Sequence, residues 1–192
     1  MYEQGMKQES TIEFVGRLKD LYPEYPLPGE GEYEACVGSL EYISFASPAV
    51  EFCEYVHARR LSWFDCSWEK DLLPLEEDTT IMPDYIFASP FLRYYFPMCL
   101  HVCVRFFMGD YEAGEFGNVD SFVEHTLNSM IDHTSCLAPE ERELLVQFCL
   151  LMEGSECHDY LQYPYLRRVV DKDAPQLKRG DFEPNRKRVP SV

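Results

Sequence analysis

Apolar residues recur at helical spacing in several stretches of this chain of 192 residues. Such spacing gathers them on one face of an α-helix. It predicts helices over 9–22, 34–45, 48–60 and 119–133, one that begins at Pro139, and a last one over 158–170. No stretch alternates convincingly in the manner of a strand, and only 30–45 and 160–170 leave room for a short hairpin. The pattern therefore predicts a mostly helical domain with at most a small hairpin.

The most apolar stretch lies in the middle of the chain, over residues 91–108, and reads FLRYYFPMCLHVCVRFFM. A helix that is apolar nearly all round is buried at the centre of its fold. Two arginines, a histidine and Pro97 interrupt the stretch, which disfavours a membrane span. Proline lacks the N–H that a helix interior needs, so Pro97 predicts a kink. We therefore expect a single-domain helical bundle around a buried, Pro-kinked central helix, with long loops.

Two identical Phe-Ala-Ser-Pro tetrapeptides contain the steps Ser47-Pro48 and Ser89-Pro90. A serine hydroxyl can accept a hydrogen bond from an early helical N–H, and proline suits the first helical position. Both steps therefore predict helix starts. The sequences that follow them do not match, so they indicate shared capping chemistry and no true repeat.

Charge is distributed unevenly along the chain, which carries 34 acidic and 17 basic residues and a net charge of −17. Residues 171–192 carry a net charge of +2, and residues 1–170 carry −19. This predicts an acidic helical domain over 1–170 and a basic C-terminal tail over 171–192. An acidic body repels nucleic acid and anionic membranes and attracts a basic protein. The simpler alternative is that the acidity serves solubility alone.

The chain has eight cysteines and no recognisable signal peptide, which favours reduced thiols in the cytoplasm. Cys53 and His57 lie four residues apart on a predicted helix, and Cys99, His101 and Cys103 cluster on the central one. A structural zinc ion needs four ligands, and neither group supplies them alone. Buried free cysteines that pack as small apolar side chains explain the pattern more simply. We expect no metal ion and no cofactor.

Catalytic motifs are absent from the sequence. It contains no G-x-S-x-G, H-E-x-x-H, Walker or G-x-G-x-x-G pattern. Cys157 and His158 are neighbours, but adjacent helical residues do not face one another. His125, Asp132 and His133 lie on a predicted helix with nothing to single them out. We expect no catalytic residues and no enzyme, with a hydrolase-like Cys/His/carboxylate site as the alternative.

Acidic loops that also carry tyrosines are the remaining feature of interest. Aromatic side chains supply buried contact area at interfaces, and carboxylates pair with Arg or Lys of a partner. The predicted partner-binding residues form three clusters: Glu30, Glu32, Tyr33 and Glu34; Glu76, Glu77, Asp78 and Asp84; Asp110, Tyr111, Glu112 and Glu115. The alternative is that these are solvated loops whose aromatic side chains point inward.

The stretch from Leu61 to about Leu127 resembles a family of small bacterial domains of unknown function. Their signature is a Ser/Thr-Pro step followed by an Arg-aromatic-aromatic-Leu-Pro-Ala motif that opens a long apolar helix. The chain has Ser89-Pro90 and then the hexapeptide Arg93-Tyr94-Tyr95-Phe96-Pro97-Met98. Phe96 stands in place of Leu and Met98 in place of Ala, while Trp63 or Trp68 supplies an upstream tryptophan.

Such domains look like members of toxin–immunity loci, in which small acidic proteins serve as immunity factors. The resemblance implies structural roles for two motif residues: Arg93 would pair with a buried acid, and Pro97 would set the helix bend. Together with the charge, it predicts a cytoplasmic immunity protein that binds a basic toxin or effector, such as a nuclease, and occludes it. A protein-binding adaptor domain is a further alternative.

Overall fold

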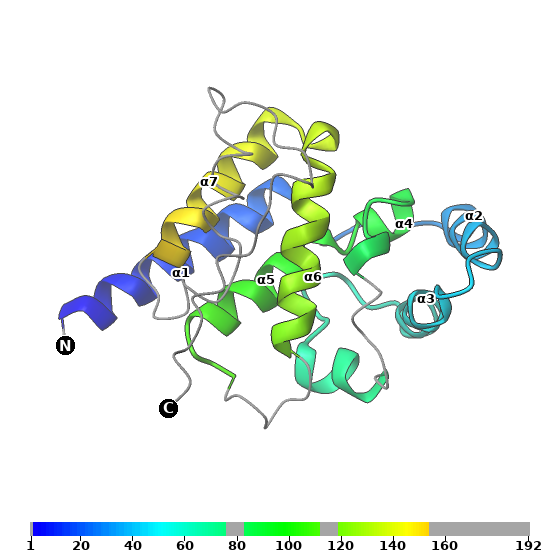
Figure 1. Ribbon diagram of the computed structural model, residues 1–192, viewed down its shortest axis with the longest axis horizontal. Coiled ribbons are helices and arrows are strands. Elements are labelled where there is room, and N and C mark those ends of the chain that lie inside the picture. Colours follow the sequence, from blue (N-terminus) through cyan, green and yellow to red (C-terminus); the bar gives the residue numbers. More distant parts are fainter. Residues whose placement is uncertain (1, 76–82, 112–118, 154–192) are drawn as a thin grey trace, which may run out of the picture.

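The computed structural model describes residues 2–75, 83–111 and 119–153, and these residues contain helices and no strand (Figure 1). The α-helices are α1 (Tyr2–Leu21), α2 (Glu30–Leu40), α3 (Ser47–Arg59), α4 (Pro90–Arg93), α5 (Phe96–Phe107), α6 (Val119–Asp132) and α7 (Pro139–Glu153). A π-helical turn covers Trp68–Leu72, and 3-10 turns cover Leu73–Leu75, Pro83–Tyr85 and Thr134–Cys136. The predicted mostly helical single domain is confirmed.

Helix α5 lies at the centre of the fold, where it packs against α1, α6 and α7 (Figure 1). Its side chains Met98, Cys99, Leu100 and Cys103 have no solvent exposure. Helices α1 and α7 lie side by side, whereas α2 and α3 pack together at the end of the molecule opposite the N-terminus. The apolar stretch in the middle of the sequence therefore forms the core, as predicted.

The bend in the central apolar stretch falls before Pro97. The chain leaves α4 after Arg93, turns through Tyr94 and Tyr95, and enters α5 at Phe96. Pro97 is the second residue of α5, where a helix has no partner for the N–H that proline lacks. The stretch is thus two helices joined by a turn, and the proline favours a helix start there.

The two Ser-Pro steps differ in their capping. The Ser89 hydroxyl accepts a hydrogen bond from the Leu92 N–H at 3.2 Å and caps α4, as predicted. Helix α3 has Ala46 at its N-cap, so Ser47 is its first residue and instead donates to Glu51 Oε1 at 3.0 Å. The prediction of a serine cap is therefore right for Ser89 and wrong for Ser47.

Helix α2 starts earlier than predicted, so residues 30–34 are helical and are no part of a loop. The Glu32 carboxylate accepts a hydrogen bond from the Gly29 N–H at 2.8 Å, which satisfies one of the free donors at the helix start. Helix α2 ends at Leu40 and a turn follows it. Helix α1 also begins earlier than predicted. The predicted helix over 158–170, the hairpin position at 160–170 and the tail over 171–192 lie outside the described residues.

A buried ion pair joins α1, α4 and α7. Glu141, buried in the first turn of α7, accepts hydrogen bonds at Oε1 from the Tyr22 hydroxyl (2.7 Å) and Arg93 Nη2 (2.5 Å). Its other oxygen accepts one from the Ala138 N–H at 2.7 Å, which caps α7. The expected pairing of Arg93 with a buried acid is therefore confirmed.

We expect Glu141→Ala to lower the free energy of unfolding by roughly 3 kcal/mol, because it leaves the largely buried Arg93 without its counter-charge. Urea denaturation followed by circular dichroism measures the loss. Glu143→Ala is the matched control, since Glu143 is exposed on the same helix and its removal should change stability by less than about 0.5 kcal/mol. Equal losses in the two variants would contradict a structural role for the ion pair.

Candidate functional site

Helices α2 and α3 form an antiparallel hairpin that stands at one end of the molecule (Figure 1). Residues on the inner faces of both helices are almost completely buried: Cys36, Leu40, Ala49, Phe52, Cys53 and Val56. Most of these side chains are small, and small side chains let two helices approach closely. The hairpin is therefore a rigid support for the residues that it carries outward.

The tip of the hairpin, residues 41–46, exposes three large apolar side chains. Tyr42 is 89% exposed, Phe45 is 73% exposed and Ile43 is 42% exposed. Two hydrogen bonds order the backbone of this turn: the Ile43 N–H donates to Leu40 O (2.9 Å), and the Ala46 N–H donates to Ile43 O (3.1 Å). Adjacent large apolar residues held out in water are typical of interaction sites.

Sequence reasoning missed this tip because it assigned residues 34–45 to one continuous helix. In such a helix Tyr42 and Phe45 would share a face and could pack inward. The end of α2 at Leu40 instead leaves the sequence Tyr-Ile-Ser-Phe in a turn. The available signal was the Ser47-Pro48 step directly after it, which marks a new helix start and so a turn before it.

Carboxylates occur along the whole hairpin. Glu41 precedes Tyr42 in the chain, and Glu51 lies one helical turn into α3. The hairpin carries six exposed acidic residues: Glu30, Glu32, Glu34, Glu41, Glu51 and Glu54. Glu30 and Glu32 lie in the first turn of α2, at the base of the hairpin, where Arg59 and Arg60 end α3. The tip therefore has an apolar centre with Glu41 and Glu51 near it.

A cleft of about 750 Å³ lies at the base of the hairpin, between residues 25–30, the end of α3, and Phe91 and Tyr95. His57 Nε2 is 3.0 Å from Glu30 Oε2 at this cleft. The His57 ring also stacks on Tyr33, with ring centres 3.9 Å apart and an angle of 4° between their planes. Of the first predicted cluster, Glu30 and Tyr33 thus hold His57, Glu32 caps α2, and Glu34 is exposed.

The described members of the second and third predicted clusters lie outside the α2–α3 hairpin. Asp84 is exposed, with Oδ2 3.1 Å from His125 Nδ1 of α6. Asp110 pairs with Arg105 of α5 at 3.2 Å. Tyr111 is 6% exposed and packs under the Arg105 guanidinium, so the inward-pointing alternative describes it better than a surface contact. Five members fall outside the described residues: Glu76, Glu77, Asp78, Glu112 and Glu115.

The cysteine and histidine groups considered as metal ligands do not converge. Cys53 points between α2 and α3, whereas His57 turns toward Tyr33 and Glu30. On α5, Cys99 and Cys103 are fully buried, while His101 stacks on Phe64. Within the described ranges, no three His, Cys, Asp or Glu residues are placed to hold a metal ion. The helices of these ranges also include none that is both long enough and apolar enough to cross a membrane.

His101 provides a test of the packing around α5. Burial and the nearby positive charge of Arg105 lower the pKa of His101 below 6.5; Lys19 adds to this effect, and Asp110 and Glu69 oppose it. The unfolded chain therefore binds this proton more readily, and stability is lost as the pH falls from 6.5 toward the lower folded pKa. We expect the urea midpoint to fall less between pH 7.5 and pH 5.5 in His101→Gln than in the unmodified protein. Parallel pH curves for the two proteins would contradict this.

No protein-family model, curated protein or solved structure matches this chain.

Proposed function

We propose that this protein is an immunity protein, which binds a cognate bacterial toxin or effector in the cytoplasm and neutralises it by occlusion. The supporting observation is the tip of the α2–α3 hairpin, where Tyr42, Ile43 and Phe45 are exposed to solvent and the carboxylates Glu41 and Glu51 lie nearby. The proposed partner is a basic protein with an apolar pocket for the two rings.

The apolar residues of the tip supply the affinity. Aromatic side chains that enter a pocket dominate the binding energy of many interfaces, because each buries a large area and loses little rotational freedom. Turn hydrogen bonds already order the backbone that carries Tyr42 and Phe45, so binding loses little further conformational entropy. A preformed tip of this kind suits insertion into a groove of the partner.

The acidic residues determine which class of partner is favoured. A nuclease carries Lys and Arg at its substrate-binding surface, because that surface must neutralise phosphates. The exposed carboxylates of the hairpin complement such a surface, and the net charge of −17 raises the rate of encounter. An acidic protein that covers this surface blocks access of nucleic acid to it. This electrostatic match favours a nuclease as the toxin.

We expect Tyr42→Ser combined with Phe45→Ser to weaken toxin binding by about 100-fold or more, since both anchors are removed. The toxin to use is a candidate encoded beside this gene; binding is measured by biolayer interferometry and neutralisation by survival of cells that express the toxin. The fold should remain intact, because both side chains are exposed.

Two control variants make this test specific. Ile12→Ser removes another exposed apolar side chain, 68% exposed on α1, and should leave affinity unchanged. His57→Gln removes the imidazole at the cleft and should leave protection intact, whereas a hydrolase that uses this cleft would lose protection. Full protection by the doubly substituted protein, with its fold verified, would contradict the proposed role of the tip.

We also expect removal of acidic charge from the hairpin to slow association. Glu34→Gln, Glu41→Gln and Glu54→Gln together should lower the association rate constant about tenfold at low salt and flatten its dependence on ionic strength. The dissociation rate should change much less.

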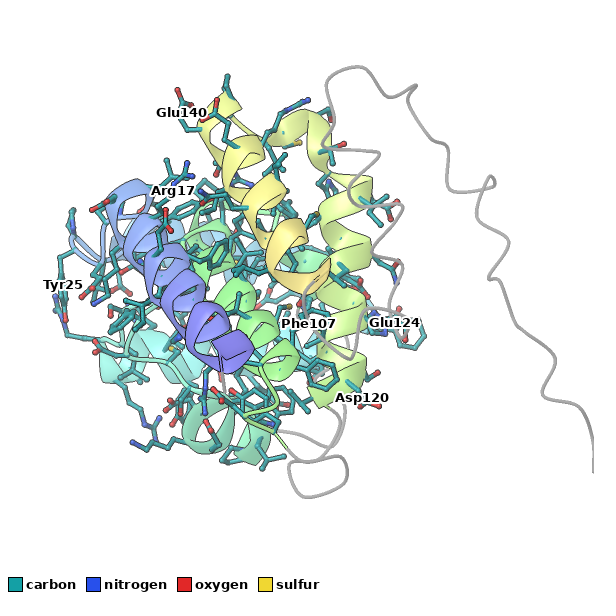
Figure 2. The ribbon with its side chains drawn as sticks, turned by 90° about the vertical axis from the view of Figure 1, so that its left-hand side faces the viewer. Arg17, Tyr25, Phe107, Asp120, Glu124 and Glu140 are labelled. Atoms are coloured by element: carbon teal, nitrogen blue, oxygen red, sulfur yellow. The ribbon has the colours of Figure 1, made fainter. Side chains whose placement is uncertain are left out.

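The matched control removes the same charge elsewhere. It combines Asp120→Asn, Glu124→Gln and Glu140→Gln, on α6 and α7 (Figure 2). If both triple variants slow association equally, total charge controls the encounter and the acidic residues of the hairpin have no special part.

A further inference from the structure

Two cysteines face each other inside the α2–α3 hairpin. The Sγ atoms of Cys36 on α2 and Cys53 on α3 are 3.7 Å apart, and both residues are free thiols. The Ser89 hydroxyl, at the start of α4, donates a hydrogen bond to Cys36 Sγ at 3.0 Å. The two sulfur atoms are thus in van der Waals contact, and small side-chain rotations would shorten their separation to the roughly 2.0 Å of a disulfide bond.

Cys36 differs chemically from other buried cysteines of the chain. Burial raises the pKa of the Cys66, Cys99 and Cys103 thiols, which keeps them protonated and unreactive. The pKa of Cys36 is instead lowered, because the hydrogen bonds from the Cys53 thiol and the Ser89 hydroxyl to its sulfur outweigh the opposing effect of burial. The same contact with Cys36, together with burial, raises the pKa of Cys53.

We propose that Cys36 and Cys53 are a reversible dithiol–disulfide pair, oxidised by hydrogen peroxide or another hydroperoxide. The contact between the two sulfur atoms and the hydrogen bond from Ser89 carry this assignment. It is independent of the proposed partner, because it concerns only the inner face of the hairpin.

The reaction has two steps. The Cys36 thiolate attacks one peroxide oxygen, the O–O bond breaks, and a Cys36 sulfenic acid and hydroxide form. The Cys53 thiol then attacks the Cys36 sulfur, the S–O bond breaks, the disulfide forms and water leaves. In total two thiols lose two electrons and two protons, and one hydrogen peroxide becomes two water molecules. A dithiol such as dithiothreitol reverses the oxidation.

Access of the oxidant to the pair requires a local opening of the packing, because both cysteines are at most 1% exposed. His57, one helical turn after Cys53 on α3, lines the cleft at the base of the hairpin. Opening at this cleft separates the same two helices that hold the sulfur atoms, so we expect oxidation to take minutes and to be faster than that of cysteines in the α5 core.

Closing the disulfide would join residues 17 positions apart and enclose the tip within the loop. A cross-link restricts the unfolded chain and so favours the folded state. For a loop of this length in a protein of this size, the melting temperature should rise by roughly 5–10 °C.

The test uses the full chain, treated with hydrogen peroxide under native conditions and then blocked with N-ethylmaleimide. Mass spectrometry of a non-reducing digest should find the Cys36 and Cys53 peptides joined, two hydrogens lighter than the separate thiol peptides and separable by dithiothreitol. Thermal unfolding of the oxidised protein should show the higher melting temperature. Blocked, unoxidised thiols at both positions, while the exposed Cys136 is oxidised, would overturn the proposal.

Matched variants identify the attacking residue. In Cys53→Ser, which keeps a hydrogen-bond donor beside Cys36, the Cys36 sulfenic acid has no thiol partner and should be trapped by dimedone, whereas Cys66→Ala removes another buried thiol and should leave disulfide formation unchanged. Circular dichroism verifies the fold of each variant. A disulfide that joins other cysteines, or the absence of dimedone labelling at Cys36 in the folded Cys53→Ser variant, would also overturn the assignment.

Discussion

The hydrogen-bonded pair of Arg93 and Glu141 determines how α4 packs against the start of α7. Arg93 ends the short helix α4, directly before the turn that precedes the buried α5, and Glu141 lies in the first turn of α7. The Tyr22 hydroxyl, just beyond α1, binds the same carboxylate. Because the chain must satisfy these three groups together, the bend before α5, the end of α1 and the start of α7 have fixed positions. The hairpin that follows α1 is then held at a defined distance from the core.

The sequence predicted the parts of the fold that depend on apolar periodicity. Helices α3, α6 and α7 start within one residue of their predicted positions, whereas the central helix, predicted to begin at Pro90, proved to be α4 and α5. It placed the bend at Pro97 because proline disrupts helix interiors, although a proline two residues into a helix marks its start. It also anticipated that Arg93 would meet a buried acid. The identity of that acid depends on a contact across 48 residues, which local pattern cannot supply.

The candidate site was harder to predict, because exposure is a property of the whole fold. The pattern of acidic residues and tyrosines indicated a first cluster, which lies on α2. It indicated Asp84 and Tyr111 equally strongly, although Asp84 contacts His125 and Tyr111 is buried. Whether a tyrosine faces water or the core depends on packing by distant segments. The tip was missed because the predicted helix ran to residue 45, whereas α2 ends at Leu40. This difference of a few residues decides whether Tyr42 and Phe45 lie on a packed helix or in an exposed turn.

The turn hydrogen bonds that hold the tip come from the backbone alone. The side chains of Tyr42 and Phe45 contribute little to the stability of the free protein, since they remain in water. Under the proposed function, recognition and folding are therefore encoded in separate sets of residues along the same hairpin. Substitutions at the tip should then change the choice of partner at almost no cost to the stability of the scaffold, which makes this segment the natural place to engineer binding.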